Sequence, residues 1–413
     1  VFPHCPNLRK LSKSYYLYIC TRLESDQNIR TFVAKTVSGL EAVLEQELKS
    51  LGAAETRVLT RAVEFRGDQE LLYRVNYNCF TALRILVPVL EFVILAQEDL
   101  YKNLVRMPWE RWLDPGGTLA VDAVISNSVF TNSLFVAQRS KDAVVDRIRE
   151  VHGTRPSVNL EDPTLRISIH ISGDTCTVSL DSSGNTLHKR GYRRRAGDAP
   201  VSEVLAAGLL RLAGWESSMP LYDPMCGSGT ILIEAALLAT RTPAGKFRKD
   251  FGLMKWKDFD AGLWDKVRSE ADARIISPEV RISGADSSLR AIDGATMNLR
   301  YSGMEGLIVL QKAGFHQTKP PYDQGMIITN PPYDERLKLD DSVAFYRSLG
   351  DTLKHLYGGY RAWIISADLE AMKFIGLKPI RKFKVFNGPL ECRFNGYDLF
   401  RGSLREFKSA VNK

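Results

Sequence analysis

An apolar run that ends in Asn-Pro-Pro-Tyr constrains this 413-residue chain most strongly. Residues 327–329 are typical of a short buried strand, and they lead directly into Asn330, Pro331, Pro332 and Tyr333. The second proline restricts the backbone of the first, so the amide of Asn330 and the carbonyl of Pro331 become two fixed hydrogen-bond acceptors. The ring of Tyr333 offers a surface on which a flat base can stack. An ordinary turn after a strand is the alternative.

Two such acceptors suit the methylation of an exocyclic amino group on a nucleobase. This amine is a poor nucleophile because its lone pair is delocalised into the ring. When Asn330 and Pro331 each accept one N–H, the nitrogen becomes more tetrahedral and its lone pair can attack an activated methyl group. The segment therefore predicts methyl transfer to a base that has left its helix. No metal is required, but a donor site must lie upstream.

A glycine turn upstream supplies the expected donor site. Residues 221–223 predict a short strand that ends at Asp223, and Pro224 follows it. Gly227 and Gly229 then precede an apolar helix. Glycines let the backbone approach a ligand closely, and a helix N-terminus favours a carboxylate. The third glycine of the dinucleotide-binding motif is missing, so a nicotinamide cofactor is not predicted.

A second strand, residues 280–286, ends in Asp286, whose carboxylate can accept hydrogen bonds from ribose hydroxyls. The separation between the glycine turn and this acid exceeds the usual ~20 residues, which indicates an insertion. The ordered set of glycine turn, acid-ended strand and Asn-Pro-Pro-Tyr resembles a class I S-adenosylmethionine-dependent amino-methyltransferase. S-adenosylmethionine is therefore the expected cofactor.

The composition limits the classes of partner that the protein is expected to bind. A net charge of +8 and a pI of about 9.1 favour a polyanionic partner, and RNA is expected. The six cysteines are scattered without a Cys-x-x-Cys pair, which argues against a zinc site and a disulfide framework. No run of about 18 apolar residues predicts a membrane span. We therefore expect neither a metal nor a membrane partner.

The sequence pattern divides the N-terminal half into three segments. Residues 1–30 are basic and poor in acids, which is typical of a transit-peptide remnant for a plastid or mitochondrion. An unstructured extension of a cytoplasmic protein is the alternative. Residues 31–98 predict a small α+β unit in which Asp68 caps a helix, and residues 99–187 predict a second one with a long helix over 133–151.

Residues 188–198 form the most basic stretch, and it lies before the segment that carries the donor site. Its cations and aromatic ring predict contacts with RNA phosphates and bases, and a solvated linker is the alternative. The predicted RNA-binding residues are Lys189, Arg190, Tyr192, Arg193, Arg194 and Arg195. The insertion at 241–264 also mixes basic and aromatic residues; it predicts either a nucleic-acid contact or a surface lid with its own small core.

From about Thr31 to Phe400, the chain resembles the bacterial-type THUMP-domain RNA guanine-N2 methyltransferases. The blocks that carry this resemblance are residues 35–41, 187–193, 223–236, 330–337 and 387–390. The resemblance implies an α/β architecture: an α+β ferredoxin-like subdomain, a THUMP domain that binds RNA, and a Rossmann-like class I methyltransferase domain over 199–413. It also implies the cofactor-binding residues, which are Asp223, Pro224, Gly227, Gly229, Asp286, Pro200 and Glu203.

The resemblance implies methylation of the N2 amine of a guanine in large-subunit rRNA, by direct transfer to a flipped-out base. A tRNA guanine is an alternative substrate. Two positions depart from the family pattern: Asp334 stands where the family has glycine, and Gly314 stands where it has the aspartate that binds the adenine amine. Without this aspartate, the free energy of donor binding is weaker by on the order of 1–3 kcal/mol, unless His316 or a backbone carbonyl replaces the contact. A catalytically weak RNA-binding ribosome assembly factor is therefore a further alternative.

Overall fold

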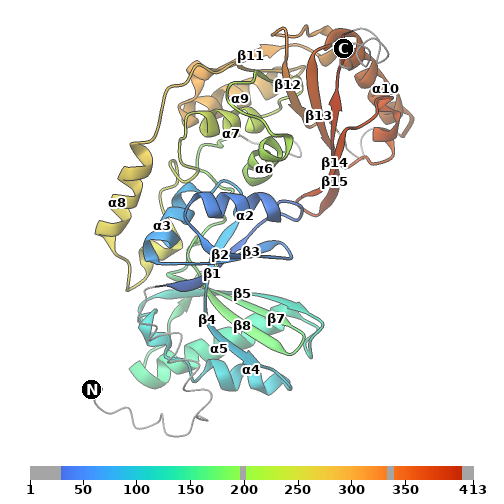
Figure 1. Ribbon diagram of the computed structural model, residues 1–413. Coiled ribbons are helices and arrows are strands. Elements are labelled where there is room, and N and C mark those ends of the chain that lie inside the picture. Colours follow the sequence, from blue (N-terminus) through green and yellow to red (C-terminus); the bar gives the residue numbers. More distant parts are fainter. Residues whose placement is uncertain (1–28, 196–200, 333–338, 402–413) are drawn as a thin grey trace.

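The computed structural model describes residues 29–195, 201–332 and 339–401 (Figure 1). Residues 1–28 of the predicted leader, Pro200, Tyr333 and Asp334 lie outside these ranges, whereas Arg30, the last residue of that leader, begins β1. Within them, the N-terminal half and the methyltransferase-like half each contain one large sheet, and the two halves lie one above the other in Figure 1. No helix in the described ranges is long and apolar enough to cross a membrane.

The N-terminal half is built on one eight-stranded sheet in the order β2-β3-β1-β4-β8-β7-β5-β6. Its strands are β1 (Arg30–Lys35), β2 (Ala54–Leu59), β3 (Ala62–Gly67), β4 (Arg84–Val93), β5 (Thr118–Ser126), β6 (Ser157–Val158), β7 (Leu165–Ser172) and β8 (Thr175–Asp181). Strand β4 pairs with β1 on one side and with β8 on the other. The two predicted α+β units therefore share a sheet, although each has a hydrophobic core of its own.

Four α-helices cover this sheet: α2 (Glu41–Ser50), α3 (Gln69–Asn78), α4 (Gln97–Leu104) and α5 (Ser133–His152). Asp68 caps α3 as predicted, because its Oδ1 accepts a hydrogen bond from the backbone N–H of Leu71 at 2.8 Å. A short 3-10 turn over Trp109–Arg111 follows α4.

The C-terminal half contains a seven-stranded sheet in the order β11-β10-β9-β12-β13-β15-β14. Its strands are β9 (Leu221–Asp223), β10 (Ile282–Asp286), β11 (Ile308–Lys312), β12 (Gly325–Thr329), β13 (Tyr360–Ser366), β14 (Arg381–Asn387) and β15 (Leu390–Asp398). The first five in this order are parallel, and β15 is antiparallel to β13 and β14. The strand order reverses between β9 and β12, where ligands bind in open α/β sheets. This topology confirms the predicted Rossmann-like fold.

Helices cover both faces of this sheet. The core on one face includes residues of α6 (Glu203–Ala213), α7 (Thr230–Ala239) and α9 (Leu289–Ser302). On the other face, α10 (Leu339–Leu356) packs against β13. The 3-10 turns are Gly252–Lys255, Glu305–Leu307, Phe315–Gln317 and Ala371–Ile375.

The insertion at 241–264 and α8 (Ala261–Asp272), which begins within it, pack against the N-terminal half (Figure 1). The indole of Trp264 is buried between Tyr73 and Tyr77, with ring centroids 5.6 and 5.8 Å away. The Lys255 ammonium pairs with Asp162 of the N-terminal half. The predicted nucleic-acid contact is therefore wrong for the buried aromatic residues of this insertion, which hold two parts of the chain together.

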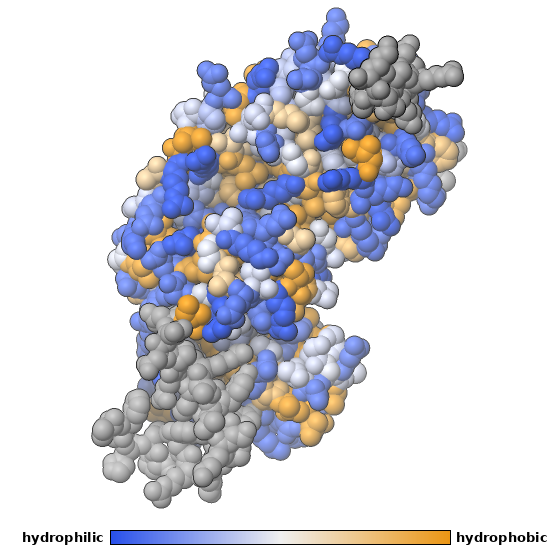
Figure 2. All heavy atoms as spheres, in the orientation of Figure 1, coloured by the Kyte–Doolittle hydropathy of each residue, from blue (hydrophilic) through white to orange (hydrophobic). Residues whose placement is uncertain are grey.

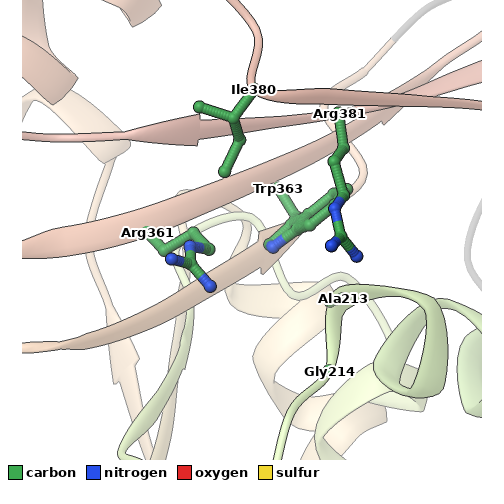
Figure 3. Close-up of a pocket in the computed structure, with 6 residues that line it drawn as sticks. All are labelled: Ala213, Gly214, Arg361, Trp363, Ile380 and Arg381. Atoms are coloured by element: carbon green, nitrogen blue, oxygen red, sulfur yellow. The ribbon is translucent and has the colours of Figure 1, made fainter.

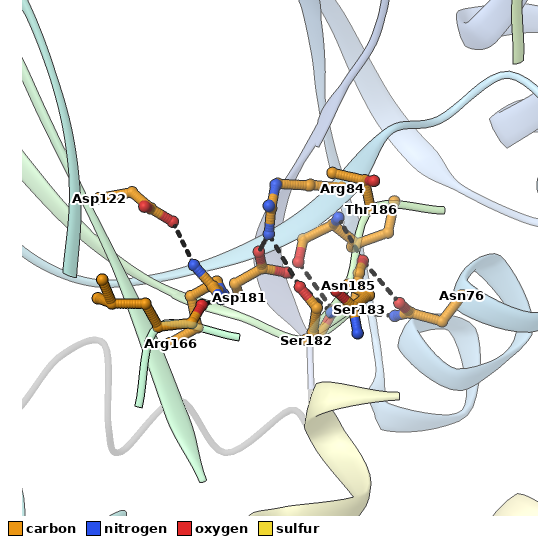
Figure 4. Close-up of polar contacts among 12 residues, drawn as sticks. Asn76, Arg84, Asp122, Arg166, Asp181, Ser182, Ser183, Asn185 and Thr186 are labelled. Atoms are coloured by element: carbon orange, nitrogen blue, oxygen red, sulfur yellow. Dashed lines mark hydrogen bonds and ion pairs between the residues drawn. The ribbon is translucent and has the colours of Figure 1, made fainter. Parts of the chain in front are cut away.

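Arg248 of the same insertion fixes the segment that joins the two halves. Its guanidinium donates hydrogen bonds to backbone carbonyls of this segment, those of Ser183, Asn185, Thr186 and Lys189. At the start of the segment, the Asp181 carboxylate pairs with Arg84, and the Ser183 hydroxyl bonds to Asn76 (Figure 4). The segment is thus anchored at both ends of its path.

A buried carboxylate joins the two halves directly. The Glu47 carboxylate accepts hydrogen bonds from the backbone N–H groups of Phe80 and Thr81, and Oε1 pairs with the Arg211 guanidinium of α6 at 2.7 Å. The side chain of Leu40 packs against Gly208 of the same helix. These contacts set the position of the C-terminal sheet relative to the N-terminal half. Figure 2 shows the molecular surface hollowed on one side between the two halves.

Candidate active site

Three predicted site residues lie together at one edge of the C-terminal sheet. Asp223 ends β9, Asp286 ends β10, and Asn330 directly follows β12. Strand β9 pairs in parallel with both β10 and β12, so the three carboxyl ends are adjacent. This edge adjoins the point where the strand order reverses, so the structure brings the three sequence motifs together in one region.

The glycine turn between β9 and α7 forms an open cradle. Gly227 and Gly229 have φ angles of +53° and +77°, a region that L side chains rarely adopt. A Cβ atom at Gly227 would meet open space, whereas one at Gly229 would lie 3.2 Å from the Cβ of Ala295. The backbone N–H of Gly227 donates to Asp286 Oδ2 at 2.9 Å. The turn can thus accept a ligand beside the Asp286 carboxylate, as the predicted cofactor requires.

Asp223 lies beneath this cradle and is 2% exposed. Its Oδ1 accepts hydrogen bonds from the Thr329 hydroxyl at 2.8 Å and from the Met225 backbone N–H at 3.1 Å. Burial raises the pKa of Asp223 to about 7, because the charged carboxylate loses its hydration. Asp223 thereby links the glycine turn to the strand that carries Asn330.

This buried carboxyl makes protein stability depend on pH. The pKa of Asp223 is about 7 in the folded protein, against an ordinary value of 3.8 in the unfolded chain. Between about pH 4 and pH 7 the carboxyl therefore ionises in the unfolded chain first. The contribution of Asp223 to the free energy of unfolding is highest below about pH 4 and falls as the pH rises to 7. Asp223→Asn keeps an acceptor for Thr329 and cannot ionise. We expect the variant to gain stability relative to the wild type between pH 4 and 7, on the order of a few kcal/mol. Urea unfolding at several pH values measures this gain, and parallel pH profiles would contradict it.

Asn330 presents a buried acceptor without a bond. Its Oδ1 atom has no hydrogen-bond partner among the residues that the structure describes. An unpaired buried amide oxygen is costly, which points to a ligand that donates to it. Pro331 is buried and Pro332 is exposed, so the segment turns outward after Asn330. The predicted stacking residue Tyr333 lies outside the described ranges.

Two of the predicted RNA-binding residues are part of the protein core. Arg190 and Tyr192 are each 1% exposed. The Arg190 guanidinium donates to the carbonyls of Leu187 and Phe80 and pairs with Glu234, and the Tyr192 hydroxyl donates to the same carboxylate at 2.8 Å. The prediction that these two side chains contact RNA is wrong, because they neutralise and bond the buried Glu234.

The remaining basic residues fall into two groups. Lys189, Arg194 and Arg195 are exposed, so their side chains are available to phosphates. Arg193 is only 17% exposed, and its guanidinium pairs with Glu203 at 3.2 Å. Glu203, a predicted cofactor-binding residue, is buried, and its Oε2 has no hydrogen-bond partner within the described ranges.

Near Gly314, the structure offers a replacement that the sequence did not suggest. The predicted substitute His316 is bonded to Thr352 of α10, with 2.9 Å between Nδ1 and Oγ1. The side-chain Oε1 of Gln317 lies 3.6 Å from the place where a Gly314 Cβ would stand. The exposed Gln317 amide thus brings a hydrogen-bond acceptor near Gly314.

A pocket elsewhere in this half has no part in the site. Figure 3 shows Arg361 near the start of β13, together with Arg381 at the start of β14 and Gly214 at the end of α6. These residues lie at the edge where the parallel strands begin, opposite Asn330. The described ranges contain no cluster of three or more metal-ligating side chains.

Comparisons with known proteins agree with this geometry. Three family models match: the RlmL ferredoxin-like domain over 31–86, the THUMP domain over 96–181, and the RMKL-like methyltransferase domain over 190–395. A protein of Synechocystis sp., provisionally named an RNA methyltransferase, is 37% identical over 373 residues, which cover 90% of this chain and 97% of that protein. The chain belongs to the RlmL-like family of THUMP-domain RNA methyltransferases.

Two further relatives place the chain within this family. The ribosomal RNA large subunit methyltransferase K/L of Methylococcus capsulatus is 40% identical over 378 residues, which cover 90% of this chain but only 51% of that protein. The crystal structure of SMU.472, provisionally described as a methyltransferase and solved with SAH, covers 91% of this chain and 100% of its own length, with a TM-score of 0.81 and 30% identity.

Proposed function

We propose that this RNA methyltransferase transfers a methyl group to the exocyclic N2 amine of a guanine in large-subunit rRNA. The observation that carries the proposal is the buried Oδ1 of Asn330, directly after β12, which has no hydrogen-bond partner among the described residues. An amide oxygen in this position can accept one N–H of a flipped-out base, and the Pro331 carbonyl can accept the other. The name of the Methylococcus relative supports large-subunit rRNA as the substrate.

S-adenosylmethionine is the methyl donor, and its sulfonium supplies an activated methyl group. The glycine turn at Gly227 and Gly229 would hold its amino-acid end, and Asp286 would hold the ribose. Asp223 supports this turn through its bonds to Met225 and Thr329. These residues position the donor and the base, and Asn330 directs the lone pair of the amine.

The adenine amine of the donor has a candidate acceptor in Gln317. We expect Gln317→Ala to weaken donor binding about twofold to tenfold, because one hydrogen bond is lost. Adding Gly314→Asp to that variant should restore affinity, since the aspartate would place a carboxylate close to the position of the lost amide. Calorimetric titration of all variants measures both effects. Unchanged affinity in Gln317→Ala would contradict this role.

The test of the function is methylation of total RNA from cells that lack the modification. The purified chain is incubated with labelled S-adenosylmethionine, the RNA is separated by size, and modified nucleosides are identified. Label in N2-methylguanosine of the large rRNA is the expected result. Label in tRNA would show that the substrate is a tRNA and not the large rRNA. Bound donor and bound RNA without transfer would overturn the proposal in favour of an assembly factor.

A further inference from the structure

A buried asparagine on α9 connects the basic segment, residues 188–198, to the glycine turn at Gly227 and Gly229. Asn298 is 1% exposed and uses both ends of its amide. Its Oδ1 accepts hydrogen bonds from the backbone N–H groups of Arg194 and Arg195, at 2.8 and 3.2 Å. Its Nδ2 donates to the carbonyls of Arg195 and Ser228, at 2.9 and 3.0 Å. Ser228 lies between the two glycines of the turn, so one side chain binds both segments.

Further contacts join the same parts. The Arg193 guanidinium donates to the Val201 carbonyl at 2.8 Å and to the hydroxyl of Thr230, the first residue of α7. On α9, Ala295 packs against Gly229, and Gly294 lies against the Arg195 side chain. The basic segment, α9 and the glycine turn therefore form one packed unit, in which the position of one part restricts the others.

The exposed face of this unit carries cations. Arg194 lies over the exposed ring of Tyr301 on α9, with the guanidinium carbon 4.6 Å from the ring centroid. Within the part of the chain that the structure describes, neither Arg194 nor Arg195 forms an ion pair, and the backbone N–H groups of both are held by Asn298. A phosphate bound by these two arginines would thus restrain backbone that is hydrogen-bonded to Asn298, and Asn298 is in turn hydrogen-bonded to Ser228 of the glycine turn.

We infer that Asn298 is a positioning residue through which RNA bound at Arg194 and Arg195 tightens the binding of S-adenosylmethionine. This inference rests on the proposed function. RNA orders the basic segment, the Asn298 amide transmits that order to Ser228, and the turn is held in its donor-binding shape. Linkage requires the effect to be reciprocal, so the donor must tighten RNA binding by the same factor.

The test measures this coupling factor in the full chain. The dissociation constant of S-adenosylhomocysteine, which cannot transfer a methyl group, is measured with and without saturating RNA. Wild-type protein is expected to bind it about fivefold or more tightly with RNA. Asn298→Ala is expected to bring the ratio close to one while each ligand still binds. Equal ratios in the wild type and the variant would overturn the inference.

Two further variants separate positioning from stability. Asn76→Ala removes another buried asparagine, in the N-terminal half, and should lower stability without changing the coupling factor. Asn298→Asp retains acceptors for Arg194 and Arg195 but loses donation to Ser228, so it should also uncouple the ligands and serves if the alanine variant does not fold. Methyl transfer by the wild type is measured in parallel: transfer without coupling would refute only this inference, and absence of transfer would refute the proposed function.

Discussion

Asn330→Ala is expected to reduce methyl transfer to RNA by at least about 100-fold, with little change in RNA affinity. Removal of one preorganised group that acts on the developing charge typically costs 10²–10³-fold in kcat. The Oδ1 atom of Asn330 makes no hydrogen bond within the described part of the protein, so its removal breaks no internal contact of that atom. Single-turnover methylation with saturating RNA and donor measures the effect on the chemical step.

Two controls make this result specific to chemistry. Asn330→Asp keeps an acceptor oxygen at the same position but adds a buried charge, so we expect it to retain more activity than the alanine variant at low pH, where the carboxyl is protonated. Thermal unfolding of Asn330→Ala should stay close to that of the wild type, whereas the buried charge of Asn330→Asp should lower its stability except at low pH, where the carboxyl is protonated. A wild-type rate in Asn330→Ala would remove this residue from the active site and leave the Asn-Pro-Pro segment as a turn.

The sequence predicted those features whose causes are local. The long helix predicted over 133–151 is α5, and Asn132 and Gly153 mark its ends by capping it. The glycine turn and Asn330 were found for the same reason, because each function depends on a few consecutive residues. The strand order itself was not predicted: the resemblance implied a Rossmann-like domain, and the structure supplies the order of its strands.

Features that depend on distant partners were not predictable. Arg190 stands in a basic stretch, but the groups that bury it, Glu234 and the carbonyl of Phe80, lie 44 and 110 residues away. Trp264 belongs to an insertion with basic and aromatic residues. Its ring contacts Phe251 and Phe259 of that insertion, but also Tyr73 and Tyr77 of α3, almost two hundred residues earlier. Strand β2 was missed because it is an edge strand: four of its six residues are exposed, and its polar and apolar residues do not alternate. Composition gives no signal for these contacts.

Arg190→Ala is expected to destabilise the protein by about 3–5 kcal/mol, because it leaves a buried carboxylate without its cation. Glu234 is fully buried, and burial raises its pKa, which the charge of Arg190 opposes. The substitution also leaves the carbonyls of Leu187 and Phe80 without these donors. The midpoint of urea unfolding should therefore fall clearly, and RNA affinity measured well below that midpoint should change little.

The matched control for Arg190→Ala is Arg194→Ala, which removes an exposed arginine four residues further along the same segment. It should change stability by no more than about 0.5 kcal/mol and weaken RNA binding, with a smaller dependence on salt. The double variant Arg190→Met with Glu234→Gln should recover part of the lost stability, since both buried charges are then absent. If Arg190→Ala instead kept wild-type stability and lost RNA affinity, Arg190 would contact RNA after all, and the buried pair with Glu234 would not form in solution.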